Sequence, residues 1–275
     1  YSHPAYYCHI PKTGGFGALL TFSKIFKRET LYKCARGNNR SIAWKEWVGK
    51  AKADKCYIVM SEDRFKLWEE YNGPKPEHVY TMIRPPREHI LSQYIHCSEL
   101  KGRKKFLIKP SLDEWLEDWV SVMKKMPNFI NDRAQYKTSI LAMMKKKYHC
   151  FEPVERMSTH LQFDANVTKK ELSQRFDVIG LLPFFSTSTC LMAIDVLKSV
   201  PASCNCSTKN KRHKIVVEDH GVKSHGDTMK ISKEQGMLMD QLIPTDTKLY
   251  KLSEELFHEA VRRVNMQFSV NLCMK

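Results

Sequence analysis

Short apolar runs alternate with segments of helical spacing along the 275 residues of this chain. The apolar runs, each about as long as a buried strand, lie at residues 5–10, 56–60, 78–83 and 178–182. Apolar residues three and four positions apart predict helices at residues 16–26, 87–97 and 245–264, and two more that begin after Ser111 and Ser232. This alternation predicts an α/β fold, with a P-loop-like parallel sheet flanked by helices in a single domain over residues 1–275.

Two of the predicted helices begin with a capping pair. Ser111 is followed three residues later by Glu114, and Ser232 is followed at the same spacing by Gln235. The least regular segment, residues 201–227, is rich in Lys, His and Ser and is too long for a tight turn. We expect a functional loop there, since long segments without periodicity are often functional.

A glycine turn joins the first predicted strand to the first helix, at His9-Ile-Pro-Lys-Thr-Gly-Gly15. Glycines in such a turn let backbone N–H groups converge on an anion, and the helix that follows presents its positive end. Lys12 adds a charge and Thr13 adds a hydroxyl. The turn is typical of a phosphate-binding loop, although it does not match the nucleoside-triphosphate motif GxxxxGKS/T. A metal-dependent NTPase is therefore disfavoured, and we predict no metal site.

A second pair of polar residues follows the strand at 78–83. Arg84 stands where that strand ends, at the carboxyl edge of the sheet, and Ser92 lies eight residues further, two turns along the next helix. A guanidinium and a hydroxyl placed in this way are suited to hold one phosphate from two sides.

The chain has 45 Lys and Arg against 30 Asp and Glu, a formal net charge of +15. This excess predicts an anionic partner. The basic runs at 101–105 and 145–147 lie in separate segments and match no nucleic-acid reading motif, so we expect no nucleic-acid partner. No run approaches the roughly 18 apolar residues of a membrane span. Since the sequence opens at Tyr1 without a signal segment, we expect membrane attachment only through an N-terminal anchor outside it.

Nine cysteines are scattered along the chain, and none forms a CxxC or a Cys/His zinc spacing. We expect two or three disulfides and at least one unpaired thiol in an oxidising lumen, with a reduced cytosol as the alternative. Sequons for N-glycosylation at Asn39, Asn166 and Asn205 agree with a lumenal chain.

The two polar motifs together, HIPKTGG and Arg-x-Pro-x-x-x-x-x-Ser-x-Tyr, resemble the cofactor motifs of sulfotransferases that use 3′-phosphoadenosine 5′-phosphosulfate (PAPS). The resemblance is greatest to the Golgi group that modifies heparan-like glycans at the 2-O and 6-O positions. It implies a sulfotransferase-type fold and transfer of a sulfuryl group from PAPS to an acceptor hydroxyl on a carbohydrate, with an anionic glycan as the expected acceptor. It also implies the Golgi lumen as the location, with the cytoplasm as the alternative.

The resemblance also implies roles for single residues. Lys12 would contact the bridging oxygen or 5′-phosphate of the donor and stabilise charge as the sulfuryl group leaves. Arg84 and Ser92 would bind the 3′-phosphate. Residues 201–227 would form a lid over the cofactor, in which Lys211 and Arg212 would assist. The full cofactor-binding set implied is Pro11, Lys12, Thr13, Gly14, Gly15, Phe16, Arg84, Ser92, Lys223 and Ser224.

The acceptor hydroxyl needs a general base. Related glycan enzymes place a His in the region that matches residues 58–65, and other branches place a Glu there. This chain has no His in that region, so Glu62 is the first candidate and Asp63 the alternative. His96 and His9 remain possible bases.

Two other functions stay open. One is the same chemistry on a small hydroxylated or phenolic metabolite, for which a closed apolar pocket is expected in place of an elongated basic groove. The other is a non-catalytic polyanion-binding module on the same fold, which would bind the 3′-phosphoadenosine product without turnover.

Overall fold

The computed structural model describes residues 4–26, 35–36, 44–62, 76–99, 110–125, 143–144, 147–148, 152–205 and 230–272. Contacts divide the chain into two compact units, and each is described by itself. The first comprises residues 1–84, 168–217 and 251–275, and the second comprises residues 85–167 and 218–250. A single domain over residues 1–275 stays a prediction. None of the helices in the described ranges has the length and apolar character needed to cross a membrane.

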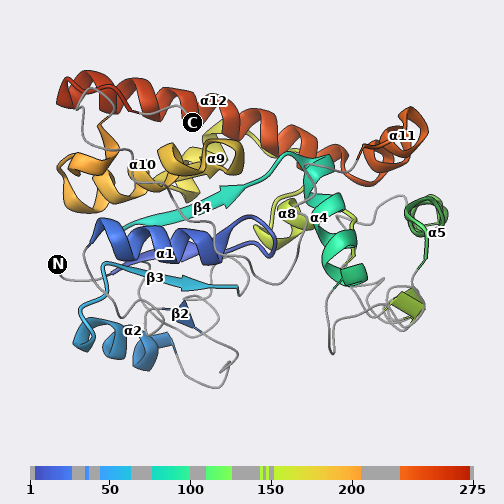
Figure 1. The fold of residues 1–275 in the computed structure, drawn as a ribbon, viewed down its shortest axis with the longest axis horizontal. Helices are drawn as coiled ribbons and strands as arrows, with labels where there is room; N and C mark the ends of the chain where they lie inside the picture. The colour runs from blue at the N-terminus through green and yellow to red at the C-terminus, as the bar shows by residue number, and fades with distance from the viewer. Residues whose placement is uncertain are drawn as a thin grey trace. The chain divides into compact units, whose positions relative to one another are not determined.

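The first unit is built on a five-stranded parallel sheet with the order β2-β3-β1-β4-β5. Figure 1 labels β2, β3 and β4 of this sheet. The strands are β1 (Ala5–Cys8), β2 (Ala35–Arg36), β3 (Ile58–Ser61), β4 (Val79–Ile83) and β5 (Val178–Leu181). Every residue of β1, β3, β4 and β5 is buried, because helices cover both faces of a parallel sheet. The four predicted strands are confirmed. The fifth, β2, spans only two residues and carries no readable pattern.

Helices flank this sheet, which confirms the predicted α/β class. They are α1 (Gly15–Ile25), α2 (Trp44–Ala53), α9 (Lys169–Arg175), η2 (Leu182–Phe184), α10 (Phe185–Leu197), η3 (Ala202–Cys204) and the part of α12 (Pro244–Phe268) from residue 251 on. Helix α10 packs against both β5 and α1. It was not predicted, because residues on nearly all its sides are buried and the apolar stripe of a surface helix is missing.

Several cysteines form disulfides, as predicted. Cys190 of α10 is bonded to Cys204 of η3, and Cys56 and Cys97 are disulfide-bonded as well. Cys8 is a buried thiol within β1.

The second unit is helical. Its elements are α4 (Pro86–Glu99), α5 (Leu112–Lys124), α8 (Arg156–His160), α11 (Lys233–Leu242) and the start of α12. Helix α11 packs against α4 and α5, around a core that includes Trp115 and Trp119. Both predicted capping boxes are present, at Ser111 and at Ser232.

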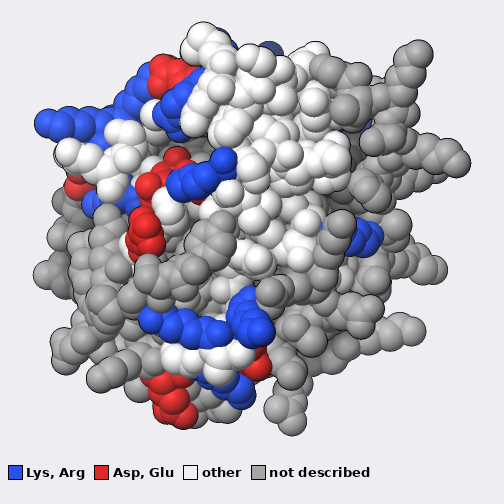
Figure 2. Space-filling model, turned by 90° about the vertical axis from the view of Figure 1, so that its left-hand side faces the viewer, with Lys and Arg blue, Asp and Glu red and all other residues white. Residues whose placement is uncertain are grey.

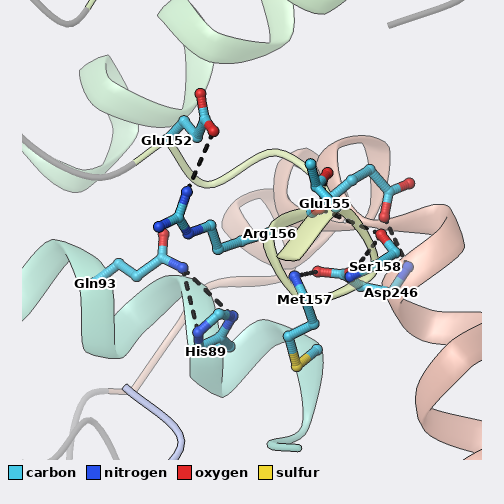
Figure 3. A network of polar contacts seen from close by, with 9 residues as sticks. His89, Gln93, Glu152, Glu155, Arg156, Met157, Ser158 and Asp246 are labelled. Carbon is cyan, nitrogen blue, oxygen red and sulfur yellow. Dashed lines mark hydrogen bonds and ion pairs between the residues drawn. The ribbon is translucent and has the colours of Figure 1, made fainter. Parts of the chain in front are cut away.

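Two buried carboxylates in this unit cap each other's helices (Figure 3). Glu155, at the start of α8, accepts hydrogen bonds of 2.7 Å from the N–H groups of Thr245 and Asp246 in α12. Asp246 in turn accepts from the N–H groups of Met157 (3.1 Å) and Ser158 (2.7 Å) in α8. Negative charge is favourable at a helix N-terminus, so this exchange joins the two helix starts.

Candidate functional site

The carboxyl end of β1 leads through a tight turn into α1. Lys12 and Gly14 both have left-handed backbones, with φ of 72° and 83°. Gly14 is the N-cap of α1, and a Cβ added there would lie 2.7 Å from Cδ1 of Leu182. Both the conformation and the lack of space require glycine at this position. The turn therefore places Lys12 directly in front of a helix N-terminus.

Two contacts at this turn could not be predicted. Leu182 lies against Gly14, and the ring of Phe185 lies within 3.4 Å of the Cβ positions of Gly14 and Gly17. Both residues come about 170 positions later in the chain, and no local sequence signal connects them to the turn. They pack η2 and the start of α10 against the glycines.

The backbone amides of the turn are partly engaged already. The N–H and the hydroxyl of Thr13 both donate to the carbonyl of Ile10, at 3.2 and 2.8 Å. The N–H of Gly15 donates to Nε2 of His9 at 3.1 Å. Thr13 and Gly15 would have to give up these acceptors to bind a phosphate. The amide of Phe16 belongs to the first turn of α1, where a helix offers no internal acceptor. Phosphate binding by the amides of Gly14 and Phe16 stays a prediction.

Two charged residues stand beside the turn on the neighbouring strands. Cys8 is paired with Ser61 of β3 and with Thr81 of β4, so the residues that follow these strands reach the same edge of the sheet. Glu62 follows β3, and its Oε1 lies 3.2 Å from Nδ1 of His9, a separation of an ion pair without the alignment of a hydrogen bond. Arg84 follows β4 and is 5% exposed. An arginine this buried is not an ordinary surface charge.

The strand order gives this edge a special position. The connection from β1 leads to the side of β2 and β3, whereas the connection from β3 passes to β4 on the other side of β1. The direction of winding therefore reverses between β1 and β4. In open parallel sheets, ligands bind outside the carboxyl ends of the strands at such a switch point. Lys12 and Arg84 follow the two strands that define it.

The remaining predicted site residues belong to the second unit or are not among the described residues. Ser92 and His96 are both on α4 in the second unit, where Ser92 is buried and His96, in the last turn, is partly exposed. The first unit thus brings together Lys12, Glu62 and Arg84, while Ser92 and His96 are described only within their own unit. Asp63, Lys211, Arg212, Lys223 and Ser224 lie outside the described residues.

An open hollow of about 670 Å³ lies in the second unit, beside the starts of α4 and α12. It is lined by Pro85, Pro86, Arg87, Glu88, Asp240, Ile243, Pro244 and Thr247. Nε of Arg87 donates to Oδ1 of Asp240 at 2.7 Å, so the basic residue of this lining already has an acidic partner. The hollow is neither a closed apolar pocket nor a basic groove, and it identifies no acceptor.

Positive charge among the described residues is mixed with negative charge. On the face drawn in Figure 2, Lys and Arg alternate with Asp and Glu. Lys169 forms ion pairs with Glu255 (3.3 Å) and Glu259 (2.6 Å). Lys147, from the basic run at 145–147, pairs with Asp118. These lysines are paired with nearby carboxylates. They therefore do not account for the excess positive charge of the chain.

Comparison with known proteins gives a weak likeness to a solved structure. No family model matches the chain, and no curated protein matches it. Among solved structures, the chain is similar to a mouse sulfotransferase, SULT7A1 complexed with PAP, over 88% of this chain and 83% of that one. The identity is 12% and the TM-score is 0.31. A likeness of this size supports no conclusion about activity. Any proposal of an activity must therefore be based on the residues of the chain itself.

Proposed function

We propose that the chain transfers a sulfuryl group from PAPS to an acceptor hydroxyl. One observation carries this proposal. The glycine turn with Lys12 and the buried Arg84 follow the two strands at the switch point of a parallel sheet, and Glu62 stands beside the turn. Two cations and a carboxylate at one sheet edge are suited to a doubly phosphorylated donor and to proton removal from an acceptor.

Each residue has a defined part in this proposal. Lys12, with the amides of Gly14 and Phe16, binds the 5′-phosphate, and Arg84 binds the 3′-phosphate with the help of Ser92. Thr13 keeps the turn in shape through its two hydrogen bonds to the carbonyl of Ile10, and Pro11 supports the same turn. Lys223 and Ser224 close over the donor.

The reaction needs positioning and charge stabilisation more than covalent chemistry. Glu62 takes the proton of the acceptor hydroxyl, whose oxygen forms a bond to sulfur. Lys12 stabilises the negative charge that develops on the bridging oxygen as its bond to sulfur breaks. The proton ends on Glu62, and the electron pair of the broken bond ends on the departing phosphate.

The acceptor in this proposal is an anionic glycan, and the location is the Golgi lumen. The net charge of +15 favours an anionic acceptor. The disulfides at Cys56, Cys97 and Cys190 favour an oxidising compartment, because cytosolic thiols are kept reduced.

Transfer of labelled sulfate from PAPS to a panel of glycans and small alcohols tests the proposal. We expect Lys12→Ala to lower turnover at least about 100-fold, since it removes the charge opposite the leaving oxygen. Lys55→Ala is the matched control, because Lys55 also has a positive φ, of 56°, but precedes β3 at the opposite edge of the sheet. It should leave turnover unchanged.

Binding of the product, adenosine 3′,5′-bisphosphate, separates the alternatives. A wild-type chain that does not bind it, or a Lys12→Ala variant with full activity, would contradict the proposal. Binding without transfer to any acceptor would point to the polyanion-binding module instead.

A further inference from the structure

We propose that His9 is a positioning residue that holds Glu62 in place relative to the first turn of α1. The inference rests on the proposed function, since it gives His9 a part in the same site. Sequence reasoning left His9 as one of several possible bases. Its contacts point to a different role.

The His9 ring is fixed by its surroundings. It is 6% exposed and stacks on Tyr7, with ring centroids 6.2 Å apart and planes inclined by 11°. Gly15 also lies against the ring, and a Cβ added there would come within 2.2 Å of it. The ring therefore fills the space in front of the first residue of α1 and has little room to turn.

The hydrogen bond from Gly15 determines which ring nitrogen carries the proton. Because the N–H of Gly15 donates to Nε2 at 3.1 Å, Nε2 is an acceptor and holds a lone pair. The neutral ring then carries its proton on Nδ1, which lies 3.2 Å from Oε1 of Glu62, a close contact without the alignment of a hydrogen bond. The lone pair that a base would need is already used by the backbone, so His9 itself is not the base.

The main effect of this arrangement is on the position of the Glu62 carboxylate. Its side chain is 60% exposed, and an exposed carboxylate on its own samples many rotamers. Contact with a buried, fixed ring limits that freedom and keeps the carboxylate beside the turn that holds Lys12. A catalytic group displaced by about 1 Å can lose on the order of 100-fold in rate, so this contact should influence turnover more than donor binding.

Two amide variants separate the two contacts of the ring. In His9→Gln the side-chain oxygen can reach the place of Nε2 and accept from Gly15, but no donor faces Glu62. In His9→Asn the side-chain nitrogen takes the place of Nδ1 and can donate to Glu62, but the acceptor for Gly15 is lost. We expect His9→Gln to lower kcat at least about tenfold with the Kd for adenosine 3′,5′-bisphosphate within about threefold of wild type. We expect His9→Asn to raise that Kd about five- to tenfold while retaining most of kcat.

A double-mutant cycle tests whether His9 acts through Glu62. In a Glu62→Gln background, His9→Gln should cause little further loss of kcat, because the group it positions is already gone. Additive losses would overturn the inference, as would equal changes in kcat and Kd in both His9 variants. Nitrogen-15 NMR of wild-type histidines offers a measurement without substitution, and a proton on Nε2 of His9 would also overturn it.

The experiments distinguish a failure of the proposed function from a failure of the role of His9. If the wild-type chain neither binds the bisphosphate nor transfers sulfate, the function and the inference fall together. If the wild type is active and the cycle is additive, only the role of His9 is wrong.

Discussion

At the residue scale, the turn after β1 depends on two glycines for different reasons. Gly14 has a left-handed backbone, whereas Gly15 has no room for a side chain because the His9 ring occupies it. Substituting either glycine therefore disturbs a different part of the turn, and the second disturbs Glu62 as well.

Gly15→Ala should destabilise the chain by about 1–3 kcal/mol, because its Cβ forces the His9 ring out of a packed position. Urea unfolding measures this loss, and titration with adenosine 3′,5′-bisphosphate measures the accompanying loss of affinity. Gly49→Ala is the control, since Gly49 lies inside α2 with open space around its Cβ position. That variant should gain up to about 1 kcal/mol from helix propensity. Equal effects at the two glycines would contradict the packing explanation.

Arg84 should determine the preference for a 3′-phosphate. Wild type should bind adenosine 3′,5′-bisphosphate at least about tenfold more tightly than adenosine 5′-phosphate, since charge-assisted hydrogen bonds are strong. Arg84→Lys keeps the charge but loses the planar fork, so this ratio should fall by about tenfold. Lys12→Ala should weaken both ligands and leave the ratio intact. Calorimetric titration of the two ligands distinguishes these results, and an unchanged ratio in Arg84→Lys would refute the assignment.

The sequence alone predicted that Lys12, Glu62 and Arg84 come at the ends of strands, because each stands within two residues of a readable apolar run. It could not supply the contact of His9 with Gly15 or that of Gly14 with Leu182. Those depend on side-chain orientation and on segments that meet only in the folded chain.

At the scale of elements, α8 and α12 are joined by the exchange between Glu155 and Asp246. Burial and the neighbouring carboxylate of Asp246 raise the pKa of Glu155 to about 8, despite the N–H donors that favour its charged form. Burial raises the pKa of Asp246 as well. The pair therefore holds protons in the folded chain that the unfolded chain would release.

This retention predicts stability that falls with rising pH. The contribution is complete below the ordinary glutamate pKa of 4.5 and is lost as the pH rises through about 8, because the folded state binds more protons over that interval. The slope for one proton is at most about 1.4 kcal/mol per pH unit. Urea unfolding between about pH 5 and pH 9 measures it. Glu155→Gln cannot ionise, so it should show a shallower decline and lose less stability than wild type at high pH. A wild-type slope equal to that of the variant would argue against the coupling.

Periodicity predicted the helices with one apolar face and failed for those without one. In α12, Leu252 and Leu256 are partly exposed although they lie at helical spacing, while Ser253 and Phe257 are buried. The helix contributes its start to one unit and its remainder to the other, so one continuous apolar stripe does not describe it.

At the scale of the whole molecule, the net charge of +15 should appear in the salt dependence of acceptor use. For a heparan-like acceptor, we expect KM to rise several-fold between about 50 and 300 mM salt, because attraction between extended charges is screened. An uncharged hydroxylated acceptor serves as the control and should show little change. Similar salt dependence for both acceptors would contradict an anionic glycan as the preferred substrate.

The position of β1 in the sheet also governs how the chain reaches its fold. This central strand is synthesised before the other strands of the described sheet, and its partners β3 and β4 come more than fifty and more than seventy residues later. The four buried residues of β1 therefore lack a neighbouring strand on at least one side until β4 has been synthesised. Non-local pairing of this kind slows folding and leaves an apolar segment open to misassociation in the interval. We therefore expect chaperones to bind the strand that leads into the glycine turn while the chain is being synthesised.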